Sequence, residues 1–327
     1  MHNAKSNQTI SRSMNNPVFD SIRRSCANEL RGKGFDTEVY FVPGGVGIKI
    51  LKEEHPSIAK IAHLPVSEFD FSLVSNPTIE NLGFFKLDGL KLSPRPAIDF
   101  AQLSSLFLKC IHADGTSASD FTFLSKHPLE ELSLRKSKLE SLSCIKETTL
   151  RVFNASNTIL DSLDHLNCIK LKSLDLFKCP IGDVSLLSDS SLEELNISGT
   201  KVFDLTPLKG KPLRKLEMRA TRVSDLAPLE DSPLEVINLP GSPIRNINCL
   251  SYLPIRDMNL IGLKLDDLTP LRTMPIKNLR ISPETLSFEE LDFLSELDLT
   301  SLCGPGDPLK QSPYDFIAKY GKRKAVK

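Results

Sequence analysis

Residues 192–212 read LEELNISGTKVFDLTPLKGKP, and residues 213–233 read LRKLEMRATRVSDLAPLEDSP. The same pattern returns in IRDMNLIGLKLDDLTPLRTMP at residues 255–275. Eight such segments begin 21 residues apart, from residue 129 to residue 276. Six offsets in each segment (0, 3, 5, 10, 13 and 16) give 48 positions, of which 46 are hydrophobic; the exceptions are Glu289 and Asp292. A fixed period of this length indicates a stacked repeat protein.

Weaker copies extend the array toward the N-terminus. They begin at Ile61, Leu82 and Leu103, again 21 residues apart. The next interval is 26 residues, which predicts a five-residue insertion within residues 112–120. With a partial copy over residues 294–302, the array contains about eleven repeats.

The spacing inside each copy predicts one short strand followed by a tight turn. LxLxL alternation is the period of a β-strand, in which successive side chains point to opposite faces. The copy is too short for a strand, a full crossover helix and two loops. A single copy cannot bury its leucines, whereas stacked copies share one continuous core. We therefore predict an α/β solenoid of parallel short strands with loops or 3₁₀ turns between them.

The consensus LxxLxLxx(T/S)x(V/I)xDLxPL resembles the leucine-rich repeat, and in particular its short bacterial, internalin-like variety. The resemblance covers residues 61 to about 302. It implies a curved array whose concave face is the sheet, and a function in binding proteins on that face. The column at offset 8 departs from the usual asparagine, because it holds mainly threonine and serine.

An aspartate at offset 12 recurs in four copies, at Asp183, Asp204, Asp225 and Asp267. Stacked carboxylates could hold cations, but aspartate also accepts backbone N–H bonds at the start of a helical turn. Pro207, Pro228 and Pro270 follow three residues later, where the first turn of a helix tolerates proline. Serine or asparagine takes the same place in other copies, which favours capping over metal binding. The threonines at offset 8 are expected to satisfy backbone groups in the turn.

Sequence outside the array predicts end caps. Residues 1–16 are expected to be disordered, and residues 17–60 to form a cap made of a helix and a hairpin around Pro43-Gly44-Gly45. The solenoid follows at 61–303. Residues 304–327 form a tail with a short helix from Pro313 to Tyr320, ending at Gly321, and a basic end. The glycine-rich stretch at 43–47 lacks GxxxxGK(S/T), which disfavours a nucleotide site.

Composition excludes several classes of protein. Lysine plus arginine and aspartate plus glutamate both number 41, so a general attraction to nucleic acid or membrane is not expected. No apolar run is long enough to span a membrane, and the N-terminus lacks the apolar segment of a secretory signal. Seven cysteines without a CxxC pair favour reduced thiols. These features predict a cytoplasmic protein.

Cys110 and His112 are the one candidate for catalysis, because residues i and i+2 of a strand share a face. No third group accompanies them in the sequence, and neither a kinase signature nor a zinc motif is present. We predict a protein that is not an enzyme and that needs no cofactor or metal. A regulatory or catalytic role for this pair remains the alternative, as does contact of the basic tail with nucleic acid or lipid.

The expected function is a scaffold that binds a protein or peptide on the concave face; the sequence leaves the oligomeric state open. Variable strand positions at offsets 2, 4 and 6 would supply the contacts, since the leucines are confined to the core. An aromatic and basic group and a row of amides and acids stand out, although such a row could also be solvated or bonded to itself. The predicted binding residues are Phe84, Lys86, Phe107, Lys109, Arg135, Asn154, Asp175, Phe177, Asn196, Lys215, Glu217, Arg219, Asn238, Asn259 and Arg280.

Overall fold

The computed structural model describes residues 17–77, 79–93, 98–118, 120–145, 148–308 and 310–325. The segment expected to be disordered, 1–16, lies outside these ranges. The chain divides into two compact units, Met1–Lys138 and Leu139–Lys327. The predicted domain boundaries stay predictions.

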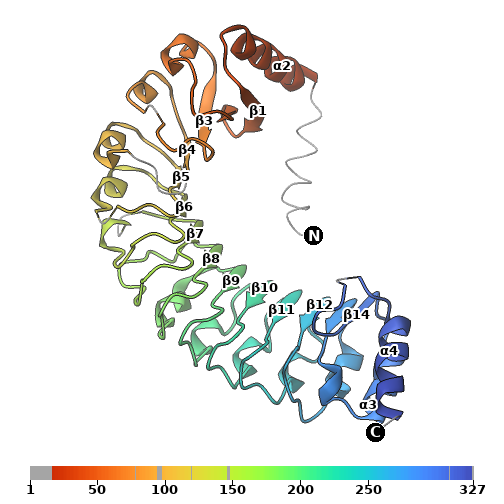
Figure 1. Ribbon diagram of the computed structural model, residues 1–327. Coiled ribbons are helices and arrows are strands. Elements are labelled where there is room, and N and C mark those ends of the chain that lie inside the picture. Colours follow the sequence, from red (N-terminus) through yellow and green to blue (C-terminus); the bar gives the residue numbers. More distant parts are fainter. Residues whose placement is uncertain are drawn as a thin grey trace. The chain divides into compact units, whose positions relative to one another are not determined.

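Unit 1 begins with helix α2 (Pro17–Gly32), followed by six strands in chain order (Figure 1). β1 and β2 form an antiparallel hairpin, and β2 to β6 are parallel. Pro43 and Gly44 form the turn of this hairpin, and the rest of the glycine-rich stretch begins β2. The strands are β1 (Thr37–Val42), β2 (Gly45–Ile50), β3 (Val66–Phe71), β4 (Gly89–Leu92), β5 (Cys110–His112) and β6 (Glu131–Ser133).

Unit 2 contains eight parallel strands, again in chain order, and two helices (Figure 1). Each strand has only three residues. The strands are β7 (Val152–Asn154), β8 (Ser173–Asp175), β9 (Glu194–Asn196), β10 (Lys215–Glu217), β11 (Val236–Asn238), β12 (Asp257–Asn259), β13 (Asn278–Arg280) and β14 (Ser301–Cys303). The helices are α3 (Phe288–Ser295) and α4 (Pro313–Ala325).

Short 3₁₀ helices connect the strands, which confirms the predicted solenoid of parallel strands. They lie at Ile58–Ile61, Leu82–Phe84, Phe100–Ser105, Thr122–Lys126, Ser143–Ile145, Ser185–Asp189, Thr206–Leu208, Ala227–Leu229, Asn248–Leu250, Thr269–Thr273 and Pro283–Thr285. The repeated hydrophobic positions form the core: Leu192, Leu195 and Leu208, for example, are at most 2% exposed.

Backbone capping accounts for the aspartate column. The Oδ1 atoms of Asp183, Asp204, Asp225 and Asp267 each accept the N–H two residues later, at 2.7–2.8 Å. That N–H belongs to the first residue of a 3₁₀ helix, where no internal acceptor is available. In the turn column, the hydroxyls of Thr158, Thr200 and Thr221 donate to the carbonyl three residues earlier. Both predicted roles are confirmed.

The predicted five-residue insertion at residues 112–120 is wrong. Glu68, Gly89, Cys110 and Glu131 are direct neighbours across β3 to β6, and each is 21 residues from the next. The N-terminal copies therefore begin at residues 66, 87 and 108 rather than 61, 82 and 103, and the period is unbroken.

The C-terminal end of unit 2 departs from the prediction in two ways. Glu289 and Asp292, the two polar residues at the repeated hydrophobic offsets, lie in α3, which replaces the expected 3₁₀ turn. A capping box between Ser287 and Glu290 caps the N-terminus of this helix. Helix α4 runs through Gly321 to Ala325 instead of ending at residue 321. Among the described residues, no helix is long and apolar enough to cross a membrane.

Candidate functional site

The residues at offsets 2 and 4 of each copy flank the buried residue at offset 3 and point away from it, and we call the surface they form the strand face. The corrected repeat frame changes its membership in unit 1. Across β3 to β6 it consists of Glu68, Asp70, Gly89, Lys91, Cys110, His112, Glu131 and Ser133. Gly47 on β2 and Tyr40 on β1 continue it, because Gly47 pairs with Glu68 and Tyr40 with Gly47.

Four predicted binding residues lie in the turns that precede β4 and β5. Phe84 ends the 3₁₀ helix Leu82–Phe84, Lys86 follows it, and Phe107 follows Phe100–Ser105; the two phenylalanines are 65% and 75% exposed. Lys109 precedes β5 and pairs with Asp88 at 3.0 Å. The repeat frame was displaced by five residues in this region, so turn residues were assigned to strand positions.

The other two members of the predicted aromatic and basic group lie just beyond strands. Arg135 is exposed two residues after β6 in unit 1, and Phe177 follows β8 in unit 2. The Phe177 ring is half-buried, with the Lys178 ammonium 5.1 Å from its centroid. The expected group is therefore not a continuous feature of one unit.

Two glycines open space on the strand face of unit 1. Tyr40 and Gly47 are register partners, and a Cβ on Gly47 would lie only 2.3 Å from the tyrosine ring. A Cβ on Gly89 would lie 2.7 Å from Glu68 Oε2. Both distances are shorter than any normal contact of a Cβ atom. Glycine at these two positions therefore allows the side chains of Tyr40 and Glu68 to lie across the neighbouring strands.

Glu68 is held by two donors in this space. The Tyr40 hydroxyl donates to Glu68 Oε1 at 2.5 Å, and Lys91 Nζ pairs with the same oxygen at 2.8 Å. Burial and the neighbouring carboxylate raise the pKa of Tyr40. Burial lowers the pKa of Lys91, but the hydrogen bond and ion pair with Glu68 outweigh this effect and raise the pKa overall. Glu68 and Lys91 thus form a charge-compensated pair.

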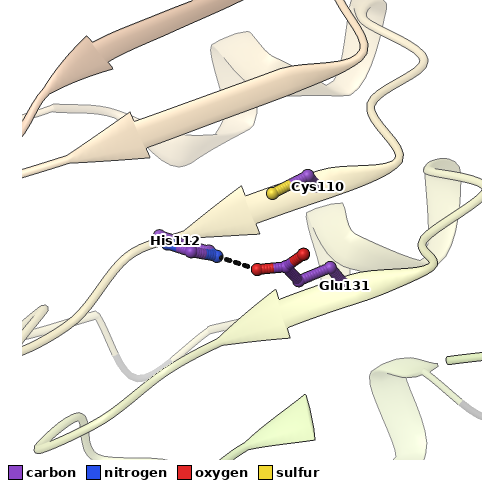
Figure 2. Close-up of side chains that lie close together, drawn as sticks. All are labelled: Cys110, His112 and Glu131. Atoms are coloured by element: carbon purple, nitrogen blue, oxygen red, sulfur yellow. Dashed lines mark hydrogen bonds and ion pairs between the residues drawn. The ribbon is translucent and has the colours of Figure 1, made fainter. Parts of the chain in front are cut away.

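Next to this pair, the side chains of Cys110, His112 and Glu131 converge (Figure 2). Cys110 and His112 are the first and third residues of β5, and Glu131 begins β6. His112 Nε2 and Glu131 Oε1 are 2.7 Å apart, and one sulfur, nitrogen and oxygen atom from the three residues all lie within 4.8 Å of one another. No third group was predicted for Cys110 and His112, and the structure supplies Glu131.

The electrostatics of this trio do not activate the cysteine. Burial raises the pKa of the Cys110 thiol to about 12, and the charges of Glu131 and Glu68 add to the effect. A nucleophilic cysteine needs the opposite shift, since the thiolate is the reactive form. The hydrogen bond with His112 lowers the pKa of Glu131, which favours the carboxylate form of that side chain.

In unit 2, the predicted row of amides and acids is largely bonded within the chain. The side-chain oxygens of Asn154, Asp175, Asn196 and Asn259 accept the backbone N–H two residues later, at 2.9–3.1 Å. Asn238 donates to Glu217 on the neighbouring strand at 2.6 Å. Four of these side chains thus cap the turn after their strand, which is not the bonding between stacked side chains that the alternative expected. Bonds within the row are those from Asn238 to Glu217 and from Asn154 to Asp175.

Other predicted residues of unit 2 face solvent. Lys215, the first residue of β10, and Arg219, two residues beyond that strand, are exposed; Glu194 lies beside Lys215 in register and is also exposed. Arg280 at the end of β13 is half-buried. On β9 and β10, exposed charges thus lie at the first strand residue and, at Arg219, beyond the strand.

The structure describes only part of the basic tail. Lys319 pairs with the buried carboxylate of Asp307 at 2.5 Å and is not available to a ligand in this arrangement. The side chains of Lys322, Arg323 and Lys324 and all of Lys327 lie outside the described residues. Contact of the tail with nucleic acid or lipid stays a prediction.

Solved structures resemble this architecture. An internalin (inlF) from Listeria monocytogenes superposes with a TM-score of 0.63 over 78% of this chain and 79% of the other, at 19% sequence identity. An internalin C2 from the same organism gives a TM-score of 0.51 over 57% of this chain and 85% of the other, at 22% identity. No protein-family model and no curated protein matches the sequence.

The chain has an internalin-like leucine-rich-repeat fold. The same fold places the Cys110, His112 and Glu131 trio and the charged residues around Lys215 on strand faces.

Proposed function

We propose that this leucine-rich-repeat protein is a cytoplasmic scaffold that binds a protein partner through the strand face of unit 2. The observation that carries the proposal is the arrangement of side chains on β9 and β10. The middle residues Leu195 and Leu216 are buried, Asn196 accepts a backbone N–H of the following turn, and the first residues Glu194 and Lys215 are exposed. Exposed charged residues of neighbouring strands therefore lie side by side on one face.

The patch formed by Glu194, Lys215 and Arg219 is the part of this face that we assign to the partner. Lys215 and Glu194 are register neighbours on β10 and β9, and Arg219 follows β10. Their mixed charges suit a polar protein surface, because charge complementarity contributes to specificity and to the rate of association. Arginine is also among the residues most enriched at protein interfaces.

Two matched triple variants test this assignment. The face variant carries Glu194→Ala, Lys215→Ala and Arg219→Ala. The control carries Glu230→Ala, Lys209→Ala and Arg245→Ala, which removes the same charges from exposed positions outside the strands. Each variant is expressed in its native cell, cross-linked and purified, and its partners are quantified by mass spectrometry.

The partner should be recovered with the wild type and the control and reduced at least tenfold with the face variant. Equal recovery with both variants would refute the proposed face. Thiol alkylation of intact cells in the same experiment tests the compartment, because a cytoplasmic protein keeps its cysteines reduced. Cysteines found in disulfides would contradict the cytoplasmic assignment.

A further inference from the structure

The trio on β5 and β6 offers three different donor atoms to one point in space. Cys110 Sγ and a ring nitrogen of His112 come from one strand, and a carboxylate oxygen of Glu131 from the next (Figure 2). Parallel pairing sets Cys110 directly opposite Glu131. Because the first and third residues of a strand share a face, the backbone geometry itself brings the three side chains together.

The donor set suits zinc. Zinc binds thiolate sulfur, imidazole nitrogen and carboxylate oxygen, and sites with three protein ligands keep a fourth position for water or substrate. Hard cations such as Mg²⁺ and Ca²⁺ prefer oxygen ligands alone, so the sulfur and nitrogen disfavour them. The His112 and Glu131 side chains are 29% and 43% exposed, which leaves a route for an ion from solvent.

The surroundings also match a divalent cation. Glu68 is already compensated by Lys91 and hydrogen-bonded by Tyr40, so it leaves Glu131 as the carboxylate beside the thiol. A Cys110 thiolate and the Glu131 carboxylate together carry the two negative charges that Zn²⁺ neutralises. Binding would release the thiol proton to solvent and replace the hydrogen bond between His112 and Glu131 by two bonds to the metal.

We propose that Cys110, His112 and Glu131 form a mononuclear zinc site on the strand face of unit 1. The site is separate from the protein-binding patch proposed for unit 2, so either proposal can fail without the other. Its construction depends on the unbroken 21-residue period, which places residue 131 beside residue 110. Gly89, the register partner of Cys110 on β4, carries no side chain, and Glu68 occupies the space above it.

The test uses the full chain, freed of metal with a chelator and kept reduced. Zinc binding is measured by competition with a chromophoric chelator, and Co²⁺ is used as a spectroscopic substitute. We expect one high-affinity Zn²⁺ per chain and a sulfur-to-cobalt charge-transfer band in the near ultraviolet. Cys110→Ser and His112→Ala should each weaken binding by at least about tenfold, and Cys110→Ser should abolish the band.

Two further variants keep the test decisive. Glu131→Gln preserves the shape of the side chain but removes its charge, and should also weaken binding by at least about tenfold. Cys249→Ser removes another partly exposed thiol, outside the trio, and should leave affinity and band unchanged. The proposal is overturned if the wild type binds no zinc, or if Cys249→Ser weakens binding as much as Cys110→Ser. Circular dichroism establishes that each variant is folded before its affinity is compared.

Discussion

At the scale of single residues, one column of the repeat has a left-handed backbone in five successive copies, whether or not glycine occupies it. Seven residues after the start of successive copies, φ is positive at Lys178, Gly199, Ala220, Gly241 and Gly262, between 51° and 78°. Side chains with a Cβ are strained in this conformation by about 1–2 kcal/mol. The non-glycine members therefore carry a cost that the glycine members avoid.

Ala220→Gly should stabilise the protein. Ala220 is exposed with φ at 51°, so the substitution relieves backbone strain without removing core packing. The greater freedom of glycine in the unfolded chain costs roughly 0.4–1 kcal/mol, which leaves an expected net gain of up to about 1.6 kcal/mol. Denaturant unfolding measures the change.

The converse substitution, Gly262→Ala, provides the control. Its φ is 78°, and no neighbouring atom lies within 4 Å of the position that a Cβ would occupy. Backbone strain of about 1–2 kcal/mol is then opposed only by the reduced freedom of the unfolded chain, and a net loss of up to about 1.6 kcal/mol is expected. If both substitutions shift stability in the same direction, the conformation of the column does not control it.

At the scale of elements, most of the fold could be predicted because strand positions and turn positions are occupied by chemically different residues. Hydrophobic spacing located β6 to β13, and the aspartate column located the 3₁₀ turns. The frame failed from residue 61 to 108 because Phe85 and Leu106, both buried, add an apolar residue between the turn and the next strand. Leu103, Leu106 and Leu108 then imitate the LxxLxL of a strand.

The same displacement explains why the trio was missed. Cys110 and His112 were recognised as sharing a face, but their neighbour across the strands is found only by counting 21 residues within the correct frame. That count reaches Glu131 directly. Tyr40 and Glu68 could not have been placed beside them from sequence, since their position depends on the space above Gly47 and Gly89.

Helix α4 is joined to the end of unit 2 through Asp307, whose side chain is only 2% exposed. Burial alone would raise the pKa of Asp307, but hydrogen bonds from Lys319, the Gly304 N–H and Tyr320 together lower it. A carboxyl whose pKa is lower in the folded than in the unfolded state stabilises the fold above its unfolded pKa, roughly 3.9. This stabilisation is lost as the pH falls through the lower folded value.

Asp307→Asn should therefore destabilise the protein by about 2 kcal/mol at pH 7, because it removes charge-assisted hydrogen bonds. The difference from the wild type should shrink as the pH is lowered below about 4. Denaturant unfolding at several pH values measures this, and hydrogen exchange in α4 shows whether the helix loosens. A difference that stays constant down to pH 3 would contradict the role of the carboxylate.

At the scale of the whole molecule, each repeat contacts mainly its immediate neighbours. In the described sheet, β10 pairs only with β9 and β11. The other inner strands of unit 2 likewise pair with the strand before and the strand after them. The stability of such an array is approximately a sum of repeat and neighbour contributions. A destabilising substitution in one repeat is therefore expected to affect the adjacent repeats most and more distant repeats progressively less.

Leu216→Ala tests this expectation, since Leu216 is the fully buried middle residue of β10. The cavity should cost about 2–5 kcal/mol. Hydrogen exchange should show the largest loss of protection in β9, β10 and β11, with progressively smaller losses toward β7 and β13. Lys215→Ala, the exposed neighbour on the same strand, serves as the control and should leave protection nearly unchanged. If Leu216→Ala instead lowers protection equally in every strand from β3 to β14, the chain unfolds as one cooperative body, because only then does a local cavity reach distant strands undiminished.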